Sequence, residues 1–145
     1  DTDDMIVEQE GITINEIFDK CGEEYFRKTE CEVIKKAAEK KNVVIATGGG
    51  VVLNEQNIEN LRKTGVIFNL SPDFSVIRER LEEARKTRPL LKRDSIENIK
   101  KRFDDRKPFY DNCDYKIKVI HGRTPRSYAM EILEIMESSQ GAEKQ

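Results

Sequence analysis

The sequence has 145 residues, enough for one domain, with 26 Lys and Arg against 28 Asp and Glu and a net charge of −2. This near-neutral balance excludes a strongly basic surface for nucleic acid or an anionic membrane, and no apolar run approaches the roughly 18 residues of a membrane span. Three cysteines without a C-x-x-C pair, and no visible secretory signal, lead us to expect reduced thiols and a cytoplasmic protein.

Helical segments are predicted along most of the chain from the spacing of its apolar residues. The first covers 14–41, with Gly22 separating a short helix from a longer one and Thr13 or Asn15 as the N-cap. Pro108 is expected to break a later helix. The other predicted helices cover 54–63, 73–86, 95–106 and a last amphipathic stretch that begins at Thr124 or Ser127.

Three short apolar runs alternate with these helices and predict strands. They are 43–47 (VVIAT), 66–70 (VIFNL) and 115–120 (YKIKVI). The first has no polar face, which is typical of a strand buried on both sides. Strands that alternate with helices indicate an α/β fold with a parallel sheet, in which ligands bind beyond the carboxyl ends of the strands.

Two short motifs carry residues suited to ligand binding. In Thr47-Gly48-Gly49-Gly50 the glycines leave backbone amides open, so the oxygens of a ligand can approach them closely. In Asp1-Thr2-Asp3-Asp4 the carboxylates could hold Mg²⁺ through water or orient a hydroxyl. Taken singly, the first is also consistent with a tight turn and the second with an acidic, solvated segment.

Three arginines lie at positions where a small anion could be held. Arg27 is inside the first predicted helix, Arg88 precedes Pro89, and Arg106 ends a helix. A guanidinium can clamp a carboxylate with two parallel hydrogen bonds, which a lysine cannot do. Considered one at a time, each arginine is more often a surface ion-pair partner.

Taken together and in order, these motifs resemble the shikimate kinase family, small P-loop kinases of the nucleoside-monophosphate-kinase-like superfamily. The resemblance covers 1 to about 137 and leaves 138–145 as a polar tail. It implies a three-layer αβα fold with strand order 2-3-1-4-5, of which strands 1 and 2 are absent here, and a lid at about 87–94. The motifs are Asp1-Thr2-Asp3, Gly22-Glu23 with Phe26-Arg27 and Glu30, Thr47-Gly48-Gly49-Gly50-Val51-Val52, Arg88-Pro89-Leu90-Leu91, Arg106 with Pro108 and Tyr110, and Arg123-Thr124-Pro125.

The resemblance implies ATP-dependent phosphorylation of the 3-hydroxyl of shikimate, a step of chorismate and aromatic amino-acid biosynthesis, with Mg²⁺ and in a monomer. One alternative is a gluconate-kinase-like sugar-acid kinase, although the order of Phe26-Arg27, the triple glycine and Arg88-Pro89 favours shikimate. Another is a non-catalytic shikimate-binding relic or regulatory module. The last is an unrelated α/β domain in which the glycines are coincidental.

The family pattern also implies roles on the acid-binding side. Asp3 would hold the shikimate 3-hydroxyl and act as the catalytic base. Arg27 and Arg106 would clamp the carboxylate. The ring hydroxyls would meet the triple glycine, Gly48, Gly49 and Gly50.

Further roles are implied on the nucleotide side. Arg88 would reach the transferring phosphoryl group and take part in catalysis, and Arg123 and Pro125 match the loop beside the adenine. Arg80 matches another nucleotide-side arginine, at a spacing one residue longer than the pattern. Asp1 would help to position Mg²⁺ through water.

The phosphate-binding motif of such kinases, G-x-x-x-x-G-K-[ST], does not occur in this sequence, because none of its eight glycines is followed by Lys. In the family layout this motif precedes the Asp-Thr-Asp segment, and its strand lies between 43–47 and 66–70. We therefore expect a fragment that lacks about thirty N-terminal residues of a normal domain. Alone, it should expose the edges of both flanking strands, be unstable and be inactive.

Overall fold

The computed structural model describes residues 1–87 and 95–142, with side chains for 1–84 and 95–139. The chain divides into two compact units, Asp1–Ile67 and Phe68–Gln145. The predicted lid, apart from Thr87 at the end of a helix, lies outside the described residues, as does Arg88.

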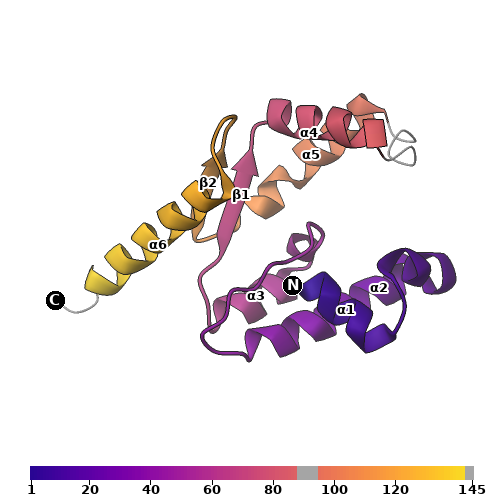
Figure 1. Ribbon diagram of the computed structural model, residues 1–145. Helices are drawn as coiled ribbons and strands as arrows, with labels where there is room; N and C mark the ends of the chain where they lie inside the picture. The colour runs from indigo at the N-terminus through magenta and orange to yellow at the C-terminus, as the bar shows by residue number, and fades with distance from the viewer. Residues whose placement is uncertain (88–94, 143–145) are drawn as a thin grey trace. The chain divides into compact units, whose positions relative to one another are not determined.

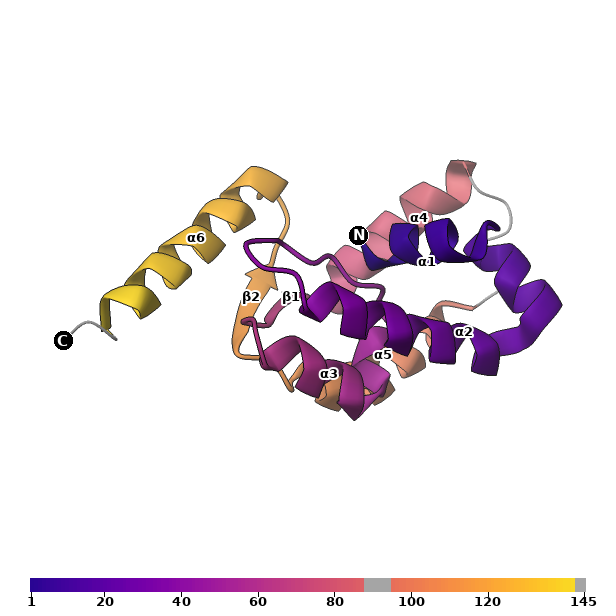
Figure 2. The ribbon, with the colours of Figure 1, turned by 90° about the horizontal axis from the view of Figure 1, so that it is seen from below.

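The first unit is helical (Figures 1 and 2), and α1 packs along α2. Its core consists of Ile6, Ile17, Phe26 and Val33, with Met5, Ile12 and Ile14 packed against them. The elements in chain order are α1 (Thr2–Glu10), α2 (Ile14–Ala38), the 3₁₀ turn η1 (Val51–Leu53) and α3 (Glu55–Arg62).

Local capping explains where the first two helices begin and end. The Asp1 carboxylate accepts hydrogen bonds from the amides of Asp3 and Asp4 and so caps α1, a helix that was not predicted from the sequence. Gly11, with φ 69°, ends it. Thr13 then caps α2 in a reciprocal capping box with Glu16, which confirms the first of its two predicted caps.

Gly22 divides α2 as predicted. Its φ of 82° and ψ of 172° are far from helical values, and residues on either side of it are helical. An L-residue rarely adopts such a φ, so glycine is the residue that permits this joint at low cost. The longer segment after Gly22 carries Arg27 and Glu30 to the candidate site described below.

The strand predicted at 43–47 is wrong, because the structure has no strand there among the described residues. Its backbone is tied instead to the start of α1, by a hydrogen bond from the Thr2 amide to the Ala46 carbonyl at 2.9 Å. It is not buried either, since Val44 is 96% exposed and Val43 is half exposed. A β-branched run becomes a strand only where a neighbouring strand satisfies its backbone, and the described residues supply none.

The second unit is built on a parallel pair of strands, β1 (Phe68–Pro72) and β2 (Tyr115–Val119), which lie side by side in Figures 1 and 2. Phe68 pairs with Tyr115 and their rings stack at 5.2 Å. The core is formed by Val76, Ile117, Val119 and Tyr128. The helices of this unit are α4 (Phe74–Thr87), α5 (Ile96–Tyr110) and α6 (Pro125–Ala142).

Element boundaries in the second unit differ from the prediction by one residue at α4 and β2 and by more at β1, α5 and α6. Strand β1 begins at Phe68, two residues later than expected. Pro108 lies inside α5 and does not break it, because it stands in the last turn, where the Asp111 amide still bonds to the Lys107 carbonyl at 3.0 Å. Helix α6 begins after Thr124, whose hydroxyl accepts from the Ser127 amide, and continues into the range predicted as a tail.

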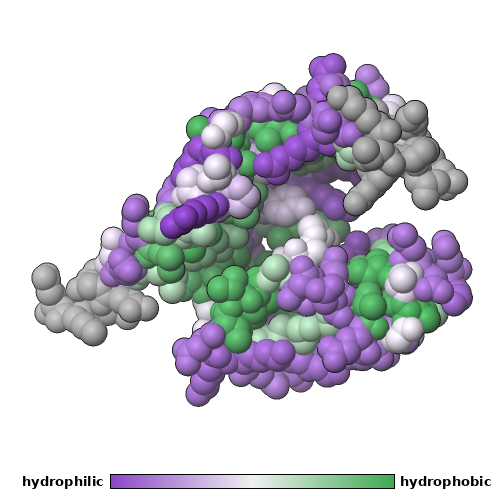
Figure 3. All heavy atoms as spheres, in the orientation of Figure 1, coloured by the Kyte–Doolittle hydropathy of each residue, from purple (hydrophilic) through white to green (hydrophobic). Residues whose placement is uncertain are grey.

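Apolar side chains remain open to solvent on both units, as the green surface in Figure 3 shows. Val66 and Leu70, near and within β1, are both about half exposed at 45% and 53%. In the described part of the chain, none of the helices has an apolar stretch of the length that a bilayer requires.

Candidate functional site

The first unit brings Asp3 against the triple glycine. A Cβ built on Gly48 would lie 2.9 Å from Asp3 Oδ1, so the carboxylate almost touches the glycine backbone. The hydrogen bond from the Thr2 amide to the Ala46 carbonyl ties the start of α1 to the segment that leads into the glycines. A hydroxyl bound at Gly48 would therefore be within reach of a carboxylate acceptor.

Arg27 lies against the other end of the same turn. A Cβ built on Gly50 would lie 2.2 Å from Arg27 Nη1 and 2.8 Å from its Cζ. A side chain at position 50 would therefore displace the guanidinium from its present place, and the glycine lets Arg27 lie directly against the backbone of the turn. The turn therefore has a carboxylate at its first glycine and a cation at its third.

The Arg27 guanidinium is held by two glutamates of its own helix. Nη1 donates to Glu30 at 2.8 Å and Nη2 to Glu23 at 3.3 Å, while Cζ lies 5.2 Å from the ring centre of Phe26. The Glu30 side chain is only 3% exposed. Burial alone would lower the pKa of Arg27, but the bonds and charges of Glu30 and Glu23 raise it above its usual value, so Arg27 stays cationic.

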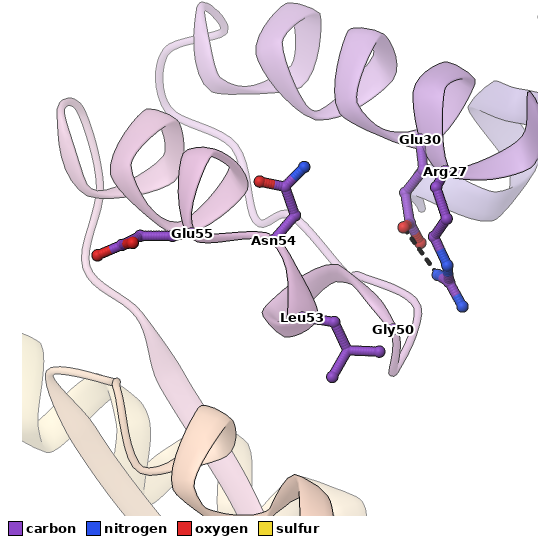
Figure 4. Close-up of a pocket in the computed structure, with 6 residues that line it drawn as sticks. All are labelled: Arg27, Glu30, Gly50, Leu53, Asn54 and Glu55. Carbon is purple, nitrogen blue, oxygen red and sulfur yellow. Dashed lines mark hydrogen bonds and ion pairs between the residues drawn. The ribbon is translucent and has the colours of Figure 1, made fainter. Parts of the chain in front are cut away.

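Arg27, Glu30 and Gly50 line a cavity of about 350 Å³ (Figure 4). Arg27 and Glu30 reach it from α2, and the rest of its wall comes from the segment between the glycines and the start of α3. The cavity has charged and amide groups together with one leucine, which suits a small polar molecule. Its lining residues are Arg27, Glu30, Gly50, Leu53, Asn54 and Glu55.

The other predicted site residues belong to the second unit. Arg106 is half-buried on α5, and Arg80 is exposed on α4. Arg123 and Pro125 lie where the chain passes from β2 into α6. The structure thus gathers Asp3, Gly48, Gly50 and Arg27 within one unit, and the roles of the second-unit arginines stay predictions.

Asp1 has a structural use besides its predicted metal role. Both of its capping bonds, from the amides of Asp3 and Asp4, fall on Oδ1, so Oδ2 is the oxygen that could accept from a metal-bound water. No group of three or more His, Cys, Asp or Glu side chains is arranged to hold a metal within the described ranges. A single carboxylate still fits Mg²⁺, which keeps several waters and binds substrate phosphates.

Glu23 and Glu30, the partners of Arg27, belong to the quoted motifs but were not predicted to have roles in the site. Their spacing was a usable signal, since residues three and four apart share one helix face. Leu53, Asn54 and Glu55 were missed as well, and no pattern marked them. They line the cavity because η1 folds the chain back beside α2, a tertiary feature without a local motif.

The chain has many relatives among known proteins. The family model described as shikimate kinase matches residues 1–137. A shikimate kinase from Caldicellulosiruptor bescii is 46% identical over 118 residues, which are 81% of this chain and 68% of the relative. A shikimate kinase from Aquifex aeolicus is 40% identical over 139 residues, 96% of this chain and 80% of the relative.

Solved structures give the same result for the fold. The crystal structure of the Aquifex aeolicus shikimate kinase superposes with a TM-score of 0.79 at 34% identity and covers 96% of this chain and 79% of its own. The Acinetobacter baumannii shikimate kinase in complex with shikimate gives a TM-score of 0.83 at 31% identity, over 95% of this chain and 77% of its own. The predicted α/β fold class is therefore confirmed.

Proposed function

Because the chain belongs to the shikimate kinase family, we propose that the protein transfers a phosphoryl group from ATP to the 3-hydroxyl of shikimate, on the route to chorismate and the aromatic amino acids. The observation that carries this proposal is the glycine turn with Asp3 at Gly48 and Arg27 at Gly50. A turn with an anion at one end and a cation at the other suits a molecule that bears both a carboxylate and hydroxyls.

Arg27 binds the substrate carboxylate in this proposal, and Arg106 supplies a second cation. The charge balance around Arg27 is the reason why two cations are needed. Arg27 already donates to both Glu30 and Glu23, so its positive charge is largely offset before an anion arrives. A second guanidinium restores a net attraction and adds the parallel hydrogen bonds that fix a planar carboxylate.

Asp3 and the glycines hold the hydroxyl end of the substrate. The Asp3 carboxylate accepts the proton of the 3-hydroxyl, the hydroxyl oxygen bonds to the γ-phosphorus, and the bond between that phosphorus and the β,γ-bridging oxygen breaks to release ADP. Gly48, Gly49 and Gly50 leave room for the other hydroxyls to approach the backbone. Catalysis by these groups rests on positioning and on charge, which is what phosphoryl transfer requires.

The nucleotide side of the proposal involves the remaining predicted residues. Arg88, outside the described residues, contacts the transferring phosphoryl group, and Arg80 assists on the same side. Pro125 belongs to the loop beside the adenine, together with Arg123. When bound, Mg²⁺ would neutralise phosphate charge, and the Oδ2 of Asp1 would bind it through water.

The setting of the protein is also part of the proposal. We propose a monomer that works in the cytoplasm. We also propose that it has no nucleic-acid or membrane partner, because its near-neutral composition is not typical of proteins that bind polyanions. The sequence contains no G-K dipeptide, so these 145 residues lack the usual phosphate-binding loop. That observation favours one alternative, a module that binds shikimate without transferring phosphate.

The deciding experiment is an assay of shikimate-dependent ADP release by the protein expressed from its own gene. We expect turnover with shikimate, phosphorylation of the 3-hydroxyl by mass and NMR analysis of the product, and no turnover with gluconate. Turnover with gluconate alone would favour the sugar-acid kinase. Calorimetric binding of shikimate without any ADP release would favour the non-catalytic module.

A further inference from the structure

The loop at 120–124 is fastened at its start to the core of the second unit. The hydroxyl of Tyr128, a buried residue of α6, accepts a hydrogen bond from the Ile120 amide at 2.9 Å and donates one to the Ile120 carbonyl at 3.0 Å. The chain then turns at Gly122, where φ is 79°. One phenol thus holds both backbone groups of the residue that leaves β2.

Arg123 fastens the other end of this loop to the same helix. Its Nη1 donates to Glu131 at 2.7 Å, while its Nη2 and Nε donate to the carbonyl and hydroxyl of Ser127 at 3.1 and 3.3 Å. Its Cζ lies 4.4 Å from the ring centre of Tyr128, within the range of a cation–π contact. The guanidinium therefore spans the first two turns of α6.

These contacts use most of what an arginine offers to a ligand. A guanidinium has five N–H donors, and three of them donate to α6. One face covers a tyrosine ring, and Glu131 compensates the charge. Adenine is uncharged near neutral pH, so a base placed beside this loop needs hydrogen-bonding backbone and a flat apolar surface more than it needs a cation.

We propose that Arg123 is a positioning residue of the nucleotide site, which holds 120–124 against α6 and does not itself bind the nucleotide. The loop backbone and the ring of Pro125 then meet the adenine. This inference rests on the proposed function, because the ATP site at this loop is part of it. The sequence pattern placed Arg123 in the loop beside the adenine. The inference gives it the role of holding that loop in place, without contact to the nucleotide.

The experiment is a double-mutant cycle between Arg123 and Glu131 in the protein expressed from its own gene. Arg123→Lys, Glu131→Gln and the double variant are compared by the KM for ATP, the KM for shikimate and kcat. Arg126→Lys, at an exposed arginine in the first turn of the same helix, is the matched control. Amide hydrogen exchange of 120–124 without nucleotide gives a readout independent of catalysis.

We expect each single variant to raise the KM for ATP by about five- to tenfold, the loss of roughly one charge-assisted hydrogen bond, and the double variant to be no worse than either single. The KM for shikimate and kcat stay near wild type, and exchange at 120–124 becomes faster in both variants. The control changes none of these values.

Two results would overturn the inference. If Arg123→Lys raises the KM for ATP while Glu131→Gln leaves it unchanged, Arg123 contacts the nucleotide directly. If neither variant speeds exchange in the loop, Arg123 does not fasten it. Failure of the proposed function can be told apart from failure of this inference. In the first case the wild-type protein would release no ADP with shikimate, and the exchange measurement would still show whether Arg123 holds the loop.

Discussion

Two arginines in this molecule have nearly the same partners and differ in what surrounds them. Arg27 bonds to Glu30 at 2.8 Å beside the ring of Phe26, and Arg123 bonds to Glu131 at 2.7 Å beside the ring of Tyr128. Arg27, however, lines a cavity and lies against Gly50, whereas Arg123 also donates to the backbone and hydroxyl of Ser127.

The comparison teaches that an arginine's role depends on the groups it leaves available. In both places a glutamate fixes the guanidinium and an aromatic ring supports it. Gly50 lies beside the Arg27 guanidinium and has no side chain, so a ligand in the cavity can approach the guanidinium. At Arg123 the next neighbour is another part of the chain, so the guanidinium joins two elements. The following predictions test this difference, starting with the largest effect.

Asp3→Asn should have the greatest effect, because it removes the proton acceptor at Gly48, in the same glycine turn that Arg27 contacts at Gly50. We expect kcat to fall by about 10²- to 10⁴-fold, the usual contribution of a general base, with a smaller change in the KM for shikimate. Steady-state kinetics with both substrates measures this. A kcat close to wild type would remove Asp3 from the reaction and leave the first-unit cavity as a binding site only.

Gly50→Ala should damage the site next most, because the added methyl would stand where the Arg27 guanidinium now lies, 2.2 Å from Nη1. The guanidinium must move, and we expect the KM for shikimate to rise by about tenfold or more. The KM for ATP is the internal control and should stay unchanged. A rise in both KM values alike would mean that the methyl disturbs the fold, and not Arg27 alone.

Arg27→Lys should sharpen the comparison with Arg123. The lysine keeps the charge and loses the two-pronged geometry, so we expect about a tenfold higher KM for shikimate and an unchanged KM for ATP. Arg123→Lys should give the opposite pair of changes. Arg106→Lys should follow Arg27→Lys if both clamp the carboxylate, and unchanged KM values in both would remove the clamp.

Thr13→Ala should lower stability without touching either arginine. The Thr13 hydroxyl accepts from the Glu16 amide in the capping box of α2, and loss of such a cap costs about 1 kcal/mol. Denaturant unfolding should show this shift in midpoint while both KM values stay at wild type. An altered KM for shikimate would show that loss of the N-cap changes the position of Arg27, although Gly22 interrupts the helix between them.

The smallest effect is a change of stability with pH at the same cap. A hydrogen bond from the Thr13 amide, with smaller contributions from the Thr13 hydroxyl and Lys20, lowers the pKa of Glu16 from 4.5 to about 2. The ionised carboxylate therefore stabilises the folded state fully above pH 4.5, and this contribution is lost as the pH falls toward 2. An NMR titration of the Glu16 carboxyl should have its midpoint near 2, and a midpoint near 4.5 would contradict the cap.

The fold was predictable where local signals and their partners are both within the chain. Helices over 14–41 and 54–63 follow from apolar spacing and caps, and the break at Gly22 follows from the residue itself. The prediction of a strand at 43–47 was wrong because a β-branched run indicates extended backbone but not what pairs with it. Helix α1 was not predicted, because its start depends on the Asp1 carboxylate, whose expected role was that of a metal ligand.

The candidate site was predictable to the same degree. The motifs identified the family correctly, as the match over residues 1–137 confirms, and they marked Asp3, Arg27 and the glycines that the fold then brings together. The wall formed by Leu53, Asn54 and Glu55 was not predictable, because it arises from the path of the chain after the glycines. The roles of Arg88, Arg106 and Arg80 remain predictions.

The open segment at 43–47 has a consequence for handling the chain. An apolar, β-branched run with Val44 almost wholly in solvent can pair with the same run of another copy, and such segments seed cross-β aggregates. When the 145-residue chain is purified alone, it should form fibrils that bind thioflavin, and more of them as the protein concentration is raised. Val44→Lys places a charge in the middle of the apolar run at 43–47, and this variant should stay monomeric and soluble under the same conditions.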